Sequence, residues 1–138
     1  MAGPSATRLR KQRPRAALVL VDDRDLRSAI VDLLSEIGWD AEVVTSYRAA
    51  RDAILARRPG VLLVEPGLHV DLLERFVSGF EDRASVPGLV ILSDLADAAR
   101  VADEHDVAFV RAPFDLEDLS DALEWARCAR VAAHASSR

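Results

Sequence analysis

The chain has 138 residues, of which 50% are hydrophobic and 30% are charged, and its formal net charge is −5. This length corresponds to about one domain and the apolar content suffices for a core, so we exclude a wholly disordered chain and expect no second folded module. The longest apolar run is far shorter than the roughly 18 residues that span a bilayer, so we expect no membrane-spanning segment.

The first fifteen residues differ in composition from the rest of the chain. They hold five basic residues and no acidic one, so residues 1–15 carry +5 and the remaining chain carries −10. Two prolines and the absence of apolar periodicity predict a disordered basic leader. Because an acidic domain repels phosphate backbones, we do not expect nucleic acid as a partner, although an adaptor that binds nucleic acid through the leader remains an alternative.

From residue 16 onward, short apolar runs alternate with longer amphipathic segments, which is typical of β-α units that form a parallel sheet. The central runs are apolar nearly throughout, as in strands that helices cover on both faces. The predicted strands span residues 17–21, 41–44, 61–64, 89–92 and 107–110. We therefore predict an α/β domain over residues 16–130, a three-layer α/β/α sandwich around a five-stranded parallel sheet, and a short tail over residues 131–138.

The segments between the strands show the spacing of amphipathic helices. They span residues 26–37, 47–54, 72–80, 95–104 and 116–126. Gly38 is suited to end the first helix, and Ser46 precedes the second. We expect Asp94 to cap the fourth helix and Asp115 to cap the fifth, because aspartate side chains accept hydrogen bonds from the free amides of a first turn.

Ligands of this architecture bind beyond the carboxyl ends of the strands. The polar residues at those places are Asp22 and Asp23, Glu65, Ser93 with Asp94, and Arg111 beside Ala112. Three carboxylates suit a hard cation such as Mg²⁺ and repel a free phosphate. Taken singly, Asp22 and Asp23 favour the simpler interpretation that they cap the following helix and interact with its dipole. No nucleophile–base pair and no phosphate-binding glycine loop is present, so we do not expect an enzyme.

Four segments resemble the response regulator receiver domain of two-component signalling. They are LVLVDD at residues 18–23, VLLVE at 61–65, ILS at 91–93 and FVRAPF at 109–114. The resemblance covers about residues 16–130 and implies the flavodoxin-like strand order 2-1-3-4-5. Receiver domains accept a phosphoryl group from a histidine kinase onto an aspartate. Their acid pair holds Mg²⁺, and a serine or threonine and a lysine hold the phosphoryl oxygens.

The sequence departs from the receiver pattern at the positions that carry the chemistry. Glu65 stands at the phosphoacceptor position, and Ala112, before Pro113, stands where the family has its lysine. Glutamate is one methylene longer than aspartate, and misplacing a reacting group by about 1 Å can cost on the order of 10²-fold in rate. The missing lysine removes a cation that stabilises the transferring group. The resemblance assigns the two remaining switch positions to Ser93 and Phe109.

We therefore predict an atypical, phosphorylation-independent receiver, a pseudo-receiver that acts as a protein-interaction module in signal transduction. Mg²⁺ at Asp22, Asp23 and Glu65 is the one cofactor that we expect. The alternative is a residual Mg²⁺-dependent phosphoacceptor that a histidine kinase phosphorylates.

The resemblance also implies a partner surface. Receiver domains commonly use their fourth helix, fifth strand and fifth helix for contacts, here residues 95–130. We expect a signalling protein or a second copy of the chain to bind there, with Trp125 and Arg127 as anchors, because these residue types are favoured at interfaces. The single cysteine, Cys128, and the absence of an export signal lead us to expect a cytoplasmic protein.

Overall fold

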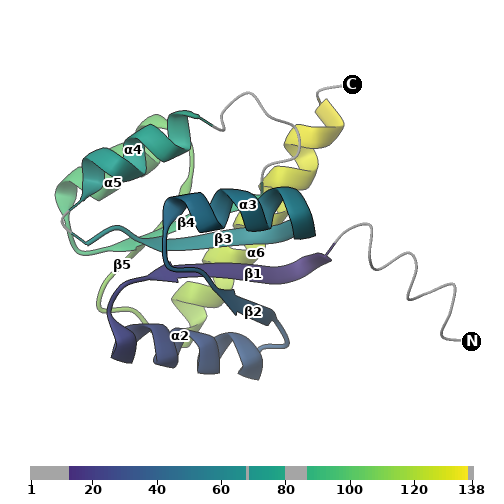
Figure 1. Cartoon of the computed structure of the whole chain (residues 1–138), viewed down its shortest axis with the longest axis horizontal. Helices are drawn as coiled ribbons and strands as arrows, with labels where there is room; N and C mark the ends of the chain where they lie inside the picture. Colours follow the sequence, from purple (N-terminus) through teal and green to yellow (C-terminus); the bar gives the residue numbers. More distant parts are fainter. Residues whose placement is uncertain (1–12, 68, 80–86, 137–138) are drawn as a thin grey trace, which may run out of the picture.

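The computed structural model describes residues 13–67, 69–79 and 87–136, with a parallel five-stranded sheet at its centre (Figure 1). The strand order is β2-β1-β3-β4-β5, which confirms the predicted order. The strands are β1 Arg13–Val21, β2 Asp40–Val43, β3 Pro59–Glu65, β4 Gly88–Ser93 and β5 Ala108–Arg111. All four neighbouring pairs are parallel, so their carboxyl ends meet at one edge of the sheet.

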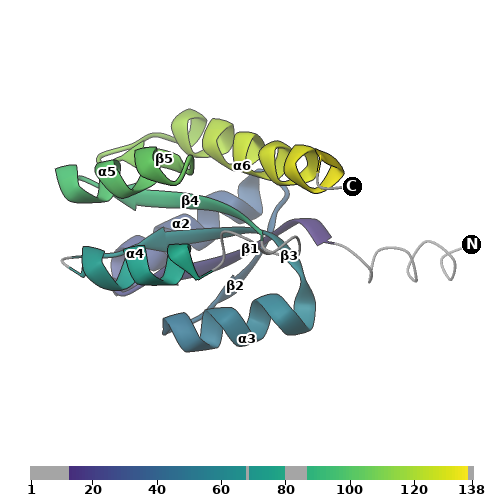
Figure 2. The same cartoon turned by 90° about the horizontal axis from the view of Figure 1, so that it is seen from above.

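Helices cover both faces of this sheet, which confirms the predicted three layers (Figure 2). They are α2 Arg24–Glu36, α3 Tyr47–Arg57, α4 Val70–Ser78, α5 Ala96–Glu104 and α6 Leu116–Ser136. The buried side chains of α2 and α6 pack on one face, and those of α3, α4 and α5 pack on the other. Within the described residues, no helix combines the length and apolar character needed to cross a membrane.

The central strands are apolar on both sides because each side faces a helical layer. In β1, Leu18 contributes to the core under α3, α4 and α5, whereas Val19 contributes to the core under α2 and α6. Leu62 and Leu63 of β3 divide between the two cores in the same way. Successive strand residues point to opposite faces, so an uninterrupted apolar run fills two cores at once.

Two boundaries differ from those expected from the sequence. The first strand begins at Arg13, three residues before the predicted start of the domain, so the end of the predicted leader belongs to the sheet. The last helix continues to Ser136, through most of the segment predicted as a tail. Residues 1–12, which make up most of the leader, lie outside the described part of the chain.

Local hydrogen bonds explain where several helices start and end. The hydroxyl of Ser46 accepts a hydrogen bond from the backbone of Ala49 at 3.0 Å and so caps α3. The carboxylate of Asp115 accepts one from the backbone of Asp118 at 2.8 Å, which confirms its predicted capping role at α6. At the end of α2, Gly38 has a φ of +85°, a conformation that glycine adopts without strain.

Candidate carboxylate site and partner face

The residues predicted to form the site lie along the carboxyl edge of the sheet. Glu65 is the last residue of β3 and pairs in register with Val21, so it lies beside Asp22, the residue that follows β1. Ser93 ends β4 and pairs in register with Arg111, the last residue of β5. The fold therefore brings the acids and the serine to one edge, as the sequence predicts.

Asp23 serves as the cap of α2. Its Oδ1 accepts a hydrogen bond from the backbone N–H of Leu26 at 2.9 Å, and its backbone is extended, as in a helix N-cap. Asp22 is exposed beside it. The capping interpretation therefore describes Asp23, and the two neighbouring acids have different local surroundings.

Glu65 uses its carboxylate within its own loop. The side chain is half-buried, and its Oε2 accepts a hydrogen bond from the backbone N–H of Gly67 at 2.9 Å. Gly67 has a φ of +61°, which lets the loop turn back over the strand end. The carboxylate at the predicted phosphoacceptor position is therefore engaged with the backbone of its own loop.

Ser93 is 3% exposed, and its hydroxyl also has a local partner. Its Oγ accepts a hydrogen bond from the backbone N–H of Leu95 at 3.0 Å, and its carbonyl accepts one from Ala112 at 3.1 Å. The prediction that Asp94 caps α5 is wrong, because the N-cap residue is Leu95 and it makes no side-chain capping bond. The serine one residue earlier provides the hydrogen bond at this turn.

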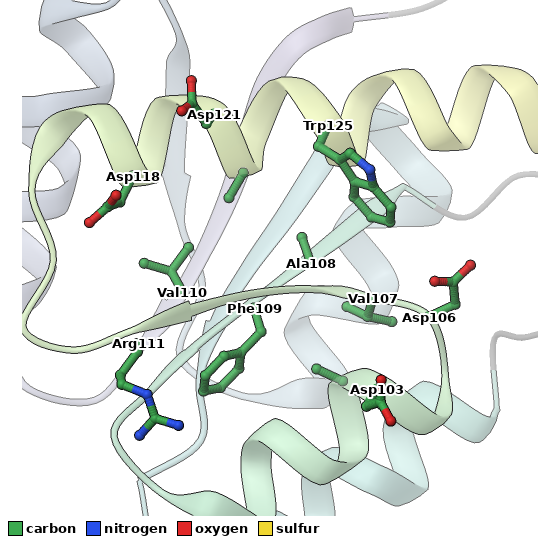
Figure 3. A pocket seen from close by; sticks show the side chains of 12 residues that line it. Asp103, Asp106, Val107, Ala108, Phe109, Val110, Arg111, Asp118, Asp121 and Trp125 are labelled. Carbon is green, nitrogen blue, oxygen red and sulfur yellow. The ribbon is translucent and has the colours of Figure 1, made fainter.

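The cation nearest in sequence to the missing lysine is Arg111. Its guanidinium carbon lies over the ring of Phe109, 5.9 Å from the ring centroid (Figure 3). The two side chains share a face because residues i and i+2 of a strand point the same way. Ala112, which stands at the lysine position, contributes a methyl group only and precedes a cis peptide bond to Pro113.

Tyr47 is a residue that the sequence analysis did not assign to this edge. It is the first residue of α3, its ring packs against Phe76 with centroids 4.9 Å apart, and burial raises its pKa to about 12. The negative charges of Asp22, Glu65 and Asp71, in that order of effect, are the smaller causes of the same rise in pKa. The phenol therefore lies within the electrostatic field of the acids, which apolar periodicity alone could not reveal.

The predicted Mg²⁺ ligands are not preassembled. A group of three metal-ligating side chains has its ligand atoms within 4.8 Å of one another in residues 13–67, 69–79 and 87–136, and it consists of Glu74, Glu104 and His105. The three predicted acids do not form such a group in this part of the chain. Arg100 already offsets part of the negative charge of that other group through ion pairs with Glu104 at 2.9 Å and Glu74 at 3.6 Å. The arrangement at the sheet edge thus does not fit a ready-made magnesium site.

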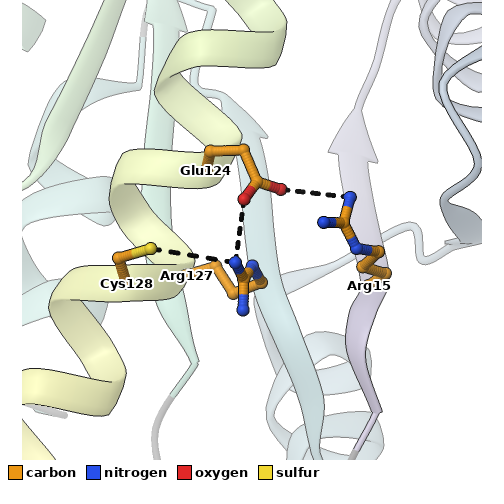
Figure 4. A network of polar contacts seen from close by, with 4 residues as sticks. All are labelled: Arg15, Glu124, Arg127 and Cys128. Carbon is orange, nitrogen blue, oxygen red and sulfur yellow. Dashed lines mark hydrogen bonds and ion pairs between the residues drawn. The ribbon is translucent and has the colours of Figure 1, made fainter.

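The two predicted interface anchors lie on different sides of α6. Trp125 is 49% exposed and lines a groove between α5, β5 and α6 (Figure 3). Arg127 donates to Glu124 at 2.8 Å, and Glu124 also pairs with Arg15 of β1 at 3.3 Å (Figure 4). The ion pair between Arg15 and Glu124 links α6 to the first strand. The hydrogen bond from Arg127 is the largest cause of the lowered pKa of Glu124.

The sequence matches no protein-family model and no curated protein. Solved structures do match its fold. The receiver domain of a response regulator from Bermanella marisrubri is 22% identical, with a TM-score of 0.69 over 83% of this chain and 98% of that one. The chemotaxis protein CheY4 of Vibrio cholerae is 17% identical, with a TM-score of 0.66 over 80% and 98%.

A third match is NtrX from Brucella abortus, which is 20% identical and has a TM-score of 0.71 over 88% of this chain and 28% of that chain. This chain therefore corresponds to a small part of that longer protein. At these identities the likeness establishes the fold, and the chain has the fold of receiver domains.

Proposed function

We propose that this chain is an atypical signalling receiver that binds a partner protein through α5, β5 and α6, without accepting a phosphoryl group at Glu65. In this proposal it has no catalytic activity of its own. The observation that carries the proposal is the state of Glu65, whose carboxylate accepts a hydrogen bond from Gly67 in its own loop. Its receiver fold supports a role in signalling, and the exposed Trp125 supports a role for that face.

The chemistry of phosphoryl transfer explains why Glu65 and Ala112 matter together. Enzymes and receivers of phosphoryl groups act almost entirely by positioning the reacting atoms and by placing cations around the transferring group. Here the acceptor position holds a longer carboxylate with a local partner, and the lysine position holds a methyl group. Arg111 does not replace that lysine in this arrangement, because its guanidinium lies over Phe109.

The alternative is a residual Mg²⁺-dependent phosphoacceptor. It is favoured by the position of Asp22, Asp23 and Glu65 at one edge of the sheet, beside Ser93. A cation could bind all three acids only if their carboxylates moved closer together. Two of these carboxylates now accept backbone hydrogen bonds, Asp23 from Leu26 and Glu65 from Gly67. The cation would relieve the mutual repulsion of the carboxylates, which is the force that favours its binding.

A titration followed by amide NMR distinguishes the two. We would add Mg²⁺ and then beryllofluoride, a phosphoryl analogue, and follow Glu65, Ser93 and Phe109. We expect the wild-type protein to give no response to beryllofluoride. The double variant Glu65→Asp/Ala112→Lys restores the shorter acceptor and the cation, so we expect it to gain a beryllofluoride response that requires Mg²⁺.

A matched control is Glu65→Asp/Ala56→Lys, which adds the same charge at an exposed position of α3. It should stay silent, because that lysine is not at the position before Pro113. A beryllofluoride response in the wild-type protein would contradict the proposal and support the phosphoacceptor. Failure of the double variant to respond would also count against it, because the two substitutions would then not explain the silence of the wild type.

A further inference from the structure

The groove between α5, β5 and α6 has a volume of about 660 Å³ and combines an apolar floor with an acidic rim (Figure 3). Phe109 of β5 and the half-exposed Trp125 of α6 are among the apolar residues that line it. The aspartates of the rim are Asp103, Asp106, Asp118 and Asp121. An apolar floor with charged edges suits a segment that carries both an apolar anchor and charges of the opposite sign.

The rim is strongly negative, because one cation stands against four aspartates. Arg111, which lies over Phe109, is the one basic residue among those that line the groove. In the described part of the chain, none of the four aspartates forms an ion pair, and all four are exposed. The groove therefore attracts a basic segment, which would lower the mutual repulsion of the aspartates.

The sequence before β1 has the complementary chemistry. Arg8, Arg10 and Lys11 surround Leu9, so cations flank an apolar side chain over four residues, and Lys11 is the only lysine of the chain. These residues are part of the basic leader, which the proposed function leaves without a role.

The first strand contacts α6, the helix that forms one side of the groove. Arg15 pairs with Glu124 at 3.3 Å, and Glu124 directly precedes Trp125 on α6 (Figure 4). From Arg13 to Arg8 an extended chain spans at most about 18 Å, whereas a helix with its side chains is about 10–12 Å wide. Residues 8–11 are therefore within reach of the groove across the width of α6.

We propose that the groove between α5, β5 and α6 binds the chain's own basic segment, with Leu9 beside Trp125 and the cations of residues 8–11 facing the aspartates. A covalently attached segment has a high effective concentration, in the millimolar range for short linkers, so weak contacts suffice to populate this state. The regulatory consequence rests on the proposed function: a partner that uses the same face must displace the segment, which lowers its apparent affinity.

Trp125 reports on the groove. The chain has two tryptophans, and Trp39 is 5% exposed whereas Trp125 is 49% exposed, so acrylamide quenches mainly the fluorescence of Trp125. In the unmodified 138-residue chain we expect the quenching constant to rise with salt, because salt shortens the Debye length from about 10 Å at 0.1 M to about 3 Å at 1 M and releases the segment. The variant Arg8→Ala/Arg10→Ala/Lys11→Ala should have the higher constant already at low salt and lose the salt dependence.

Two control variants make the result specific. Arg24→Ala/Arg48→Ala/Arg75→Ala removes the same charge from exposed positions on α2, α3 and α4 and should keep the wild-type salt dependence. Asp106→Asn/Asp121→Asn neutralises two of the four rim aspartates and should weaken the salt dependence; asparagine tolerates the positive φ of +55° at position 106. Circular dichroism melting curves establish that each variant is folded.

Three outcomes would overturn the inference. They are an unchanged salt dependence after neutralisation of residues 8–11, an unchanged salt dependence after neutralisation of the rim, and a quenching constant that depends on protein concentration. The last would mean that a second copy occupies the groove. Because this experiment contains neither Mg²⁺ nor beryllofluoride, its failure would leave the proposed function standing, and a beryllofluoride response would leave the docking standing.

Discussion

The carboxyl edge of the sheet and the groove beside α6 are both rich in aspartate or glutamate, yet the two regions use these residues differently. At the edge, Asp23 accepts a hydrogen bond from the backbone of Leu26, and Glu65 accepts one from that of Gly67. In the groove, Asp103 and Asp121 are exposed and have no ion-pair partner within the described residues.

This difference separates a structural role from a binding role. A carboxylate that accepts a hydrogen bond from a helix amide stabilises the local backbone, and that interaction is present without any ligand. Like charges around an apolar floor instead repel one another when no ligand is bound, and a ligand of opposite charge lowers this repulsion. We therefore expect ligands to bind at the groove, rather than at the sheet edge where receiver domains accept a phosphoryl group.

The groove depends on how closely α6 packs on the sheet, and Gly88 at the start of β4 tests this packing. A Cβ atom at Gly88 would lie 2.3 Å from the backbone oxygen of Ala126, far inside contact distance. We expect Gly88→Ala to lower the free energy of unfolding by about 3 kcal/mol, the upper end of typical overpacking, measured by urea denaturation. The clash should outweigh the usual gain from replacing glycine in a strand.

Gly79 provides the matched control for this substitution. A Cβ atom there would lie 3.4 Å from the nearest backbone atom, and its φ of −68° is open to any residue. We expect Gly79→Ala to change the free energy of unfolding by less than about 1 kcal/mol. Equal stabilities of the two variants would show that α6 does not approach β4 as closely as the structure has it.

The sequence predicted the sheet well, because its strands carry a strong local signal. Apolar runs such as the one from Leu18 to Val21 must be buried on both faces, which predicts a helical layer on each side of the sheet. The alternation of these runs with amphipathic segments predicts that the strands are parallel. The cap at Asp115 was equally local, since it depends on a side chain and an amide three residues apart.

Features that depend on contacts between distant segments could not be read in this way. The proximity of Tyr47 to the charges of Asp22 and Glu65 arises only when α3 packs beside the ends of β1 and β3. The groove likewise forms only when α6 packs beside β5 and α5. The prediction that Asp94 caps α5 was wrong although it concerned a local contact. Ser93 and Asp94 both lie at this turn, and it is the hydroxyl of Ser93 that accepts the hydrogen bond from Leu95.

The two adjacent acids after β1 offer a sharper test of the structural role of the edge. Asp23 caps α2 and Asp22 is exposed without a capping bond. We expect Asp23→Ala to lower the free energy of unfolding by about 1 kcal/mol, the usual effect of losing an N-cap, and Asp22→Ala to change it by less than about 0.5 kcal/mol. Thermal and urea unfolding of the two variants measure the difference. Equal losses would mean that the acids act together, as the ligands of one bound cation would.

Tyr47 gives the smallest effect but the most direct view of the charges at the edge. Burial, followed by the charges of Asp22, Glu65 and Asp71, raises its pKa to about 12, compared with about 10 in an unfolded chain. The folded state thus favours the neutral phenol. Its contribution to stability is fully present below pH 10 and is lost as the pH rises from 10 to 12.

Because Tyr47 is the only tyrosine, its ionisation can be followed by ultraviolet absorption without interference from another phenol. We expect a midpoint near 12 in the native protein and near 10 in denaturant, with circular dichroism recorded alongside to exclude unfolding. Glu65→Gln should lower the native pKa of Tyr47 without bringing it to 10, since burial is the largest cause. Glu74→Gln, whose charge is not among the causes, should leave it unchanged. A native midpoint near 10 would mean that neither burial nor the charges of the acids act on the phenol, and it would remove Tyr47 from this edge.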